Sequence, residues 1–324
     1  MPSVDRLRTP DSCFNNLPGF PYTPLYLEWK DSLRMAYVQV SNTANPNRTY
    51  LCIHGEPTWG YLFRRMIPRF IKDDPQAQVI VPDLFGFGRS DKPTDPAWYT
   101  YENHIQSLLY FIKELNLTNI TLVAQDWGGL LGLSLPNLLH PRFTRLLIMN
   151  TSLAILDKPT KGFVDWRAYC RRTPDLSPGK VVSLGTKHIT RAEMASYDAP
   201  YPDTSYKEGV RRFPELVPTL DDEKKDTEEG RSADRYGSAA RKYFESPQAS
   251  HIQVVMACGV KDPVLGVPVM ENLKRILERG CGNVVYFNVP EAGHFVQEWG
   301  EGIAERAIKE FAEMSRQSGI QGKL

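Results

Sequence analysis

Short apolar runs alternate with amphipathic stretches along most of this chain. Residues 120–123 form a continuous apolar run, as a buried parallel strand does, and residues 101–116 carry apolar side chains at helical spacing. The same patterns predict strands at 33–40, 49–53, 78–84, 145–150, 252–262 and 284–289, and helices at 64–71, 269–278 and 302–314. This alternation is typical of an α/β protein with a mostly parallel, doubly wound sheet and helices on both faces.

The alternation stops in the middle of the chain. Between residues 153 and 220 the apolar strand runs disappear, and Pro, Tyr, Arg and short helical pieces replace them. We interpret 153–220 as a helical cap inserted into a core formed by residues 1–152 and 221–324. Residues 221–235 are densely charged without apolar periodicity, which predicts a solvated helix or loop without a functional role. Residues 1–31, rich in Pro and aromatics, are expected to pack on the core as an extended segment.

One turn joins a buried strand directly to an apolar helix. Asp126 lies at its tip, and the small residues Ala124 and Gly128 stand two positions before and after it. This is the layout of the nucleophile elbow, in which a strained turn lifts one side chain clear of the sheet. An Asp before an apolar helix is also a common N-cap, so this stretch alone leaves the two interpretations even.

Two further polar residues, Asp262 and His294, follow predicted strands. Together with the turn at residues 54–56 they belong at the carboxyl edge of the sheet, where open α/β sheets bind their ligands. The order Asp126, Asp262, His294 is the nucleophile, acid and base order of the α/β-hydrolase triad. The presence of all three residue types in this order, each after a predicted strand, predicts an α/β-hydrolase fold and a catalytic function.

The chemistry of these residues is consistent with a two-step reaction. An Asp with an ordinary pKa of about 3.9 is ionised at neutral pH, so Asp126 can attack carbon without the help of a base. Water can then open the resulting ester if His294 activates it while Asp262 holds the imidazole tautomer. We expect the backbone N–H groups of Glu56 and Trp127 to stabilise the oxyanion of this second step.

The composition narrows the class of ligand. The 324 residues include 39 basic and 38 acidic ones, so the net charge of +1 favours neither nucleic acid nor an anionic membrane. A small neutral substrate is expected. Five cysteines without a CxxC pair indicate neither a disulfide framework nor a zinc site. The N-terminus lacks an apolar signal segment, and we expect a cytoplasmic monomer that needs no metal or cofactor.

With these residues in place, the chain resembles the haloalkane dehalogenases over nearly its whole length. The matching motifs are 54–59 (His-Gly-Glu-Pro-Thr-Trp), 83–93 (Asp-Leu-Phe-Gly-Phe-Gly-Arg-Ser-Asp-Lys-Pro), 125–129 (Gln-Asp-Trp-Gly-Gly), 261–262 (Lys-Asp) and 292–295 (Ala-Gly-His-Phe). The chain is most similar to the subgroup with two halide-binding tryptophans, which implies Trp127 and Trp166 for this role. Another subgroup has an Asn where Glu56 stands and its acid after the strand that ends near Asn150, so Asp262 and Trp166 are the consistent choices.

The resemblance implies hydrolytic dehalogenation of a small neutral haloalkane to a primary alcohol and a halide ion. The reaction would pass through a covalent alkyl ester on Asp126, opened by water that His294 activates. A Trp in a helical cap usually only packs, so without the resemblance packing would be favoured for Trp166. The expected pocket walls, which are equally expected as core, are Leu130, Phe163, Phe213, Pro214, Val217, Val264 and Leu265.

Two other functions compete with this one. Epoxide hydrolases share the fold, the Asp nucleophile and the ester, but they protonate the epoxide oxygen with two cap tyrosines. The cap tyrosines of this chain are Tyr169, Tyr197, Tyr201 and Tyr206. Against this function, the turn reads His-Gly-Glu-Pro instead of His-Gly-Phe-Pro, and Gln125 stands where that family often has His. A non-catalytic receptor on the same fold need not retain the whole triad, so its retention favours an enzyme.

Overall fold

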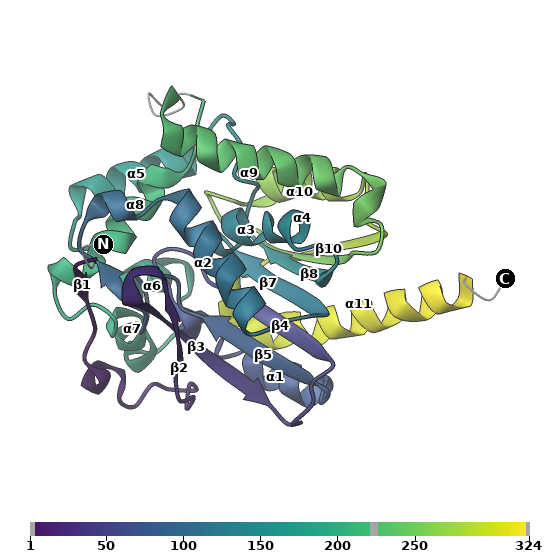
Figure 1. The fold of residues 1–324 in the computed structure, drawn as a ribbon, viewed down its shortest axis with the longest axis horizontal. Coiled ribbons are helices and arrows are strands. Elements are labelled where there is room, and N and C mark those ends of the chain that lie inside the picture. The colour runs from purple at the N-terminus through teal and green to yellow at the C-terminus, as the bar shows by residue number, and fades with distance from the viewer. Residues whose placement is uncertain (1–3, 221–225, 322–324) are drawn as a thin grey trace.

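A central sheet covered by helices on both faces forms the core of the protein (Figure 1). The computed structural model describes residues 4–220 and 226–321. The sheet strands are Leu25–Trp29 (β2), Leu33–Ser41 (β3), Arg48–Ile53 (β4), Ala77–Pro82 (β5), Ile120–Gln125 (β7), Phe143–Met149 (β8), Gln253–Gly259 (β9) and Asn283–Val289 (β10). Their order is β10-β9-β8-β7-β4-β5-β3-β2, parallel from β10 to β5 and antiparallel beyond it. The predicted mostly parallel α/β sheet is confirmed.

Two groups of helices cover the sheet. The core helices are Ile67–Asp73 (α1), Tyr101–Glu114 (α2), Trp127–Gly132 (α3), Leu135–Leu138 (α4), Glu228–Phe244 (α9), Val267–Leu277 (α10) and Gly300–Gln321 (α11). Helices α1 and α11 pack together on one face, against β5 and β9, and α2, α3, α4, α9 and α10 pack on the other. Because both faces are covered, all six residues of β7 are buried, which explains its continuous apolar run.

The helix expected at 64–71 begins three residues later than predicted. Residues Gly60–Phe63 form a 3-10 turn, and the α-helix starts at Ile67 with Pro68 in its first turn. Proline is tolerated there because the first N–H groups of a helix have no partner within it.

The N-terminal segment packs on the core, as predicted. Its strand Arg6–Leu7 (β1) pairs with Lys92–Pro93 (β6) in a separate two-stranded sheet. Phe14 and Phe20 are buried, and both rings lie edge-on to the ring of Trp59.

Four further helices lie between β8 and α9 and group together at the left of Figure 1. They are Lys161–Arg172 (α5), Pro178–Gly185 (α6), Arg191–Asp198 (α7) and Glu208–Leu216 (α8). All four fall within the expected cap range 153–220. Each of α5, α6 and α7 begins after a Thr or Ser whose side chain accepts a backbone N–H of the first turn.

The charged segment 221–235 was expected to be a solvated helix or loop. Residues 221–225 lie outside the described residues, and the remainder enters α9, which packs on α2 and α4. Its buried face is built from small residues at helical spacing, including Gly230, Ala233, Gly237 and Ala240. The helix alternative is therefore correct for the part that enters α9, but its packing on the core was not predicted, because small residues and not large apolar ones occupy the buried face.

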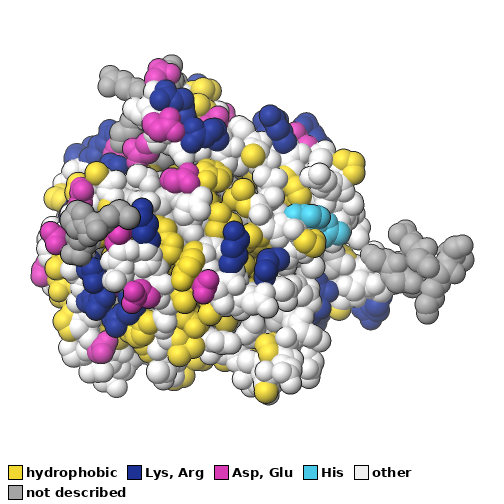
Figure 2. Space-filling view, viewed as in Figure 1, with side chains coloured by type: hydrophobic (Ala, Val, Ile, Leu, Met, Phe, Trp, Pro, Cys, Tyr) yellow, Lys and Arg dark blue, Asp and Glu magenta, His cyan; other side chains and the backbone are white. Residues whose placement is uncertain are grey.

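The surface carries charges of both signs. Figure 2 shows Lys and Arg side chains interspersed with Asp and Glu on this face, which agrees with the near-zero net charge. Across the described ranges, no helix combines the length and the apolar character that crossing a membrane requires.

Candidate active site

The turn between β7 and α3 is a strained elbow. Asp126 has φ 54° and ψ −127°, a conformation that residues with a side chain rarely adopt. Its side chain caps no N–H of α3, so the N-cap interpretation is wrong. A Cβ atom at Gly128 would overlap the carbonyl oxygen of Ile53, and one at Gly129 would overlap the Thr151 side chain. Glycines are therefore needed for α3 to pack this closely on the strand ends.

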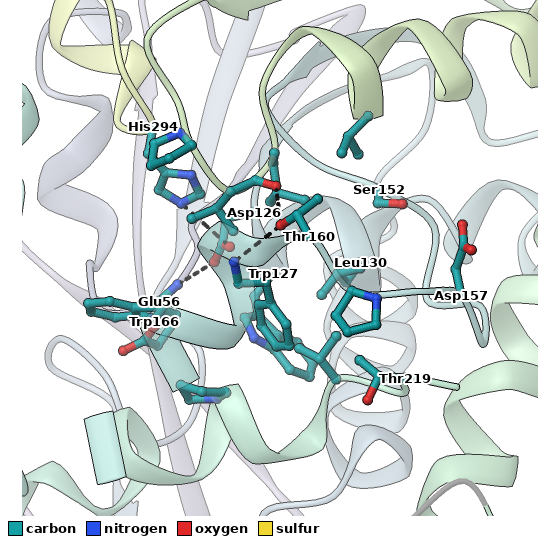
Figure 3. A pocket seen from close by; sticks show the side chains of 18 of the residues that line it. Glu56, Asp126, Trp127, Leu130, Ser152, Asp157, Thr160, Trp166, Thr219 and His294 are labelled. Carbon is teal, nitrogen blue, oxygen red and sulfur yellow. Dashed lines mark hydrogen bonds and ion pairs between the residues drawn. The ribbon is translucent and has the colours of Figure 1, made fainter. Parts of the chain in front are cut away.

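The elbow brings Asp126 to the two other predicted triad residues, and Figure 3 shows Asp126 and His294 side by side at the pocket. His294 Nδ1 lies 2.8 Å from Asp262 Oδ2, and His294 Nε2 lies 3.5 Å from Asp126 Oδ2. The other carboxyl oxygen of Asp126, Oδ1, accepts the backbone N–H of Glu56 over 2.8 Å. Trp127 begins α3, where the first N–H groups have no partner inside the helix. Of the two predicted oxyanion donors, the Glu56 N–H therefore contacts the Asp126 carboxyl group, and the Trp127 N–H belongs to the residue next to it.

The Asp262 carboxyl group is buried, and protein groups donate hydrogen bonds to both of its oxygens. Its Oδ1 accepts the Val264 backbone N–H, and its Oδ2 accepts the Asn150 amide as well as the imidazole. Burial alone would raise the pKa of Asp262, but the charge and hydrogen bond of His294, with the other two donors, lower it below its usual value. Asp262 is therefore ionised. Sequence reasoning noted Asn150 only as a non-acid and missed that it supports the acid.

His294 receives opposing electrostatic influences. Burial lowers its pKa, but the Asp262 and Asp126 carboxylates outweigh burial and raise the pKa well above its usual value. The Gln125 amide favours the unprotonated form of His294 Nε2. Its own Nε2 lies 2.9 Å from that nitrogen and can donate a hydrogen bond to it. Gln125 also donates to the His294 carbonyl and accepts from Gln297, which fixes its N–H group toward the imidazole. Once the imidazole is neutral, this arrangement favours the tautomer with the proton on Nδ1 and a lone pair on Nε2.

A pocket of about 480 Å³ opens beside these residues. Asp126, Trp127, Glu56, Trp166 and His294 line it. Six of the predicted wall residues also line it, namely Leu130, Phe163, Pro214, Val217, Val264 and Leu265. Wall residues that were not predicted include Leu153, Ile155, Thr160, Val181, Leu184 and Phe295.

The prediction for Phe213 is wrong. It is fully buried on the inner side of α8 and packs on the Trp127 ring at 4.5 Å between centroids, behind the wall and not in it. Its neighbour Pro214 lines the pocket instead. Sequence spacing could not distinguish these two, because the rotation of a cap helix about its axis depends on how the cap docks.

The two tryptophans have different surroundings. Trp127 lines the pocket, and its indole N–H has no protein acceptor within the described parts of the chain. Trp166, on α5, stacks on Tyr169 and donates its indole N–H to Glu56 Oε2 over 3.1 Å. Trp166 is therefore at the site, but its N–H already has an acceptor.

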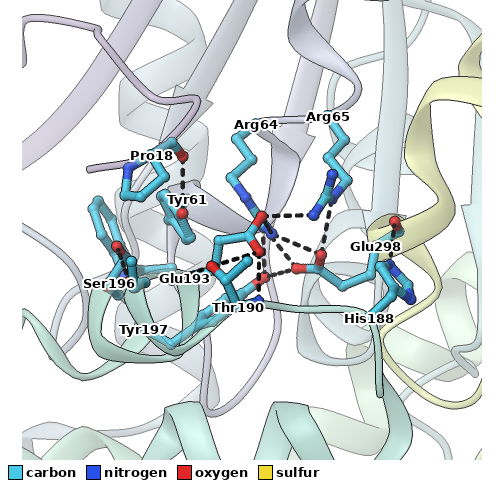
Figure 4. A network of polar contacts seen from close by, with 12 residues as sticks. Pro18, Tyr61, Arg64, Arg65, His188, Thr190, Glu193, Ser196, Tyr197 and Glu298 are labelled. Carbon is cyan, nitrogen blue, oxygen red and sulfur yellow. Dashed lines mark hydrogen bonds and ion pairs between the residues drawn. The ribbon is translucent and has the colours of Figure 1, made fainter. Parts of the chain in front are cut away.

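None of the described residues that line the pocket is a tyrosine. Tyr197 is fully buried in an ion-pair network, where its hydroxyl donates to Glu298 and accepts from Arg64 (Figure 4). Tyr201 is buried, and Tyr169 is exposed and stacks on the Trp166 ring. Within the described ranges no cluster of three or more His, Cys, Asp or Glu side chains has an arrangement that could hold a metal ion.

A strained elbow at the edge of this sheet, beneath a helical cap, defines an α/β hydrolase, and the model of the α/β hydrolase fold family matches residues 50–301. The chain is 37% identical over 309 residues to a haloalkane dehalogenase of Mycolicibacterium paratuberculosis, covering 93% of this chain and 97% of the relative. It is 43% identical over 224 residues to a haloalkane dehalogenase of Psychrobacter cryohalolentis, covering 67% and 72%. This chain belongs to the haloalkane dehalogenase family and is an enzyme.

A solved structure leads to the same family. The haloalkane dehalogenase DpaA from Paraglaciecola agarilytica NO2 superposes with a TM-score of 0.85 and 39% identity, covering 94% of this chain and 97% of DpaA. That structure is described as tetrameric. The monomer expected for this chain stays a prediction that this relative does not favour.

Proposed function

We propose that this enzyme hydrolyses haloalkanes to a primary alcohol and halide through an alkyl ester on Asp126. The observation that carries the proposal is the geometry of the Asp126 carboxyl group. One oxygen is fixed by the Glu56 N–H, the other lies 3.5 Å from His294, and both belong to a side chain that lines a mostly apolar pocket. A carboxylate held in this way can attack a carbon atom that the pocket holds in front of it.

In the first step, a carboxylate oxygen of Asp126 displaces halide from an sp³ carbon. The carbon–halogen bond breaks as the carbon–oxygen bond forms, and the halide leaves with the electron pair. Because the leaving ion is separated from bulk water, indole N–H groups of Trp127 and Trp166 replace part of its hydration.

In the second step, water opens the ester. Alkylation removes the negative charge of Asp126, one of the two charges that raise the pKa of His294, so Nε2 becomes a proton acceptor beside a neutral ester. His294 takes a proton from water, and the hydroxide attacks the ester carbon while the Glu56 and Trp127 N–H groups stabilise the oxyanion. The tetrahedral intermediate collapses, and the alkoxide leaves with the proton from His294. The Asp126 carboxylic acid formed in this way releases its proton to solvent, so each turnover yields one alcohol, one halide ion and one proton. The reaction balances without a metal or cofactor and regenerates ionised Asp126.

Epoxide hydrolysis is less well supported. It requires tyrosine hydroxyls directed at the substrate oxygen, and the pocket wall contains no tyrosine among the described residues. The Tyr197 hydroxyl is already bonded to Glu298. Indole N–H groups suit a departing halide but cannot deliver the proton that an opened epoxide needs.

The test is turnover of short primary bromoalkanes in the presence of EDTA, with bromide and alcohol measured together. We expect both products in equal amounts from the wild type and neither from Asp126→Ala. Undiminished turnover by Asp126→Ala would exclude Asp126 as the nucleophile. Diol formation from epoxides without bromide release would favour the rival function.

A further inference from the structure

The indole N–H of Trp166 already has an acceptor. It donates to Glu56 Oε2 over 3.1 Å, so the cap helix α5 meets the turn after β4 at this contact (Figure 3). The Trp127 indole has no comparable partner in the described part of the chain. A halide that takes the Trp166 N–H must therefore compete with the Glu56 carboxyl group, whereas it meets no such competitor at Trp127.

Glu56 is an unusual carboxyl group. The residue is 4% exposed, and Oε1 is buried without a hydrogen-bond partner among the described residues. Its backbone N–H donates to Asp126 Oδ1, and both residues line the same pocket. Burying an ionised carboxylate that lacks a compensating cation is strongly disfavoured.

Four titratable groups face Glu56 from the elements packed around it. They are Asp126 on the elbow, His294 after β10, Cys170 on α5 and Tyr201 after α7. Burial and the Asp126 carboxylate raise the pKa of Glu56, and the Trp166 hydrogen bond and the His294 charge lower it by less, so that it lies well above its usual value. Burial also raises the pKa of the Cys170 thiol and of the Tyr201 hydroxyl, so both are neutral. Asp126 and His294 are the charged neighbours that remain.

We propose that the Glu56 side chain is a positioning residue of the leaving-group site, holding the Trp166 indole until the departing halide accepts its N–H. The inference rests on the haloalkane reaction proposed above. Neutral Glu56 accepts only a modest hydrogen bond from the Trp166 indole N–H, so a halide can take its place as the acceptor. Ionised Glu56 accepts a stronger hydrogen bond from the indole N–H and also repels the halide. Halide affinity therefore falls as the pH rises and Glu56 loses its proton.

The experiment measures bromide binding by quenching of tryptophan fluorescence between about pH 5 and pH 9. The wild type is compared with Glu56→Gln, which keeps an oxygen for the Trp166 N–H but cannot ionise. We expect equal affinities at low pH and a wild type weakened by roughly 10- to 100-fold relative to Glu56→Gln at high pH. A pH dependence that the wild type shows and Glu56→Gln lacks is therefore assigned to the Glu56 carboxyl group.

Asp165→Asn is the matched control. Asp165 precedes Trp166 on α5, is exposed and pairs only with Lys161 among the described residues, so this variant should follow the wild type at every pH. A ratio of wild-type to Glu56→Gln affinity that stays constant with pH would overturn the positioning role and leave the proposed function intact. Absence of both bromide quenching and bromide release in the wild type would instead overturn the proposed function, and the positioning role with it.

A second measurement covers the case in which Glu56→Gln does not fold. Infrared difference spectra of the wild type at neutral pH should show a protonated carboxyl band that shifts when bromide is added. A spectrum without any protonated carboxyl response to bromide would contradict the inference.

Discussion

Asn150 donates its side-chain amide to Asp262, with Nδ2 2.9 Å from the same Oδ2 that accepts the His294 imidazole. Its Oδ1 in turn accepts the Gly259 N–H over 2.7 Å, so one amide ties the ends of β8 and β9 together beneath the acid. Both ends of the Asn150 amide are therefore used, one for the backbone and one for the carboxylate. The residue fixes which oxygen of Asp262 faces His294.

Asn150→Ala should lower the free energy of unfolding by about 1.5–3 kcal/mol, because it removes a hydrogen bond to a buried charged group. The pKa of Asp262 is lower in the folded state than its unfolded value of about 3.9. The stability from its ionised form is therefore present above pH 4 and is lost as the pH falls through the folded pKa. Urea unfolding at several pH values should show the wild-type advantage shrinking in acid. The exposed Asn45→Ala should change stability by less than about 0.5 kcal/mol.

Gln125→Met should move the pH dependence of ester hydrolysis upward. The substitution keeps the approximate volume but removes the N–H group that lies 2.9 Å from His294 Nε2 and favours the unprotonated nitrogen. Without it the imidazole retains its proton to higher pH, so the acid limb of the hydrolysis rate shifts to higher pH. The decay of the alkyl-enzyme in single-turnover experiments measures this limb. An unchanged acid limb in a folded variant would mean that Gln125 does not influence His294.

The sequence was sufficient to predict the sheet and to bring Asp126, Asp262 and His294 together, because each residue comes soon after the end of a strand and parallel strands end at one edge. The sequence was insufficient to predict the roles of Gln125 and Asn150, because the role of a side-chain amide depends on where its N–H and its C=O groups point. Phe213 was misplaced because nothing in the chain fixes the rotation of α8. The contact between Glu56 and Trp166 joins residues 110 positions apart, and no local pattern predicts which cap residue meets the turn.

Glu298→Gln should strongly destabilise the fold. Arg64 is buried and forms two hydrogen bonds of 2.7 Å with the two Glu298 oxygens, while Glu193 of the cap helix α7 accepts from the same guanidinium (Figure 4). Removing one charge leaves a buried cation poorly compensated, which typically costs about 3–5 kcal/mol. Chemical unfolding measures the loss. Asp165→Asn breaks an exposed pair with Lys161 and should cost less than about 0.5 kcal/mol, so equal effects of the two substitutions would contradict a structural role for the buried network.

His294→Gln should separate the two chemical steps. Asp126 needs no proton removed before it attacks, so the variant should release about one bromide per active site and then stop. Hydrolysis should slow by roughly 10²- to 10⁴-fold, the usual contribution of a general base. Mass spectrometry should find an alkyl group on the peptide that contains Asp126. In the wild type, acidification should have the same effect, because protonated His294 cannot accept a proton from water while ionised Asp126 still attacks. A folded His294→Gln variant without burst or adduct would show that His294 acts before or during cleavage of the carbon–halogen bond.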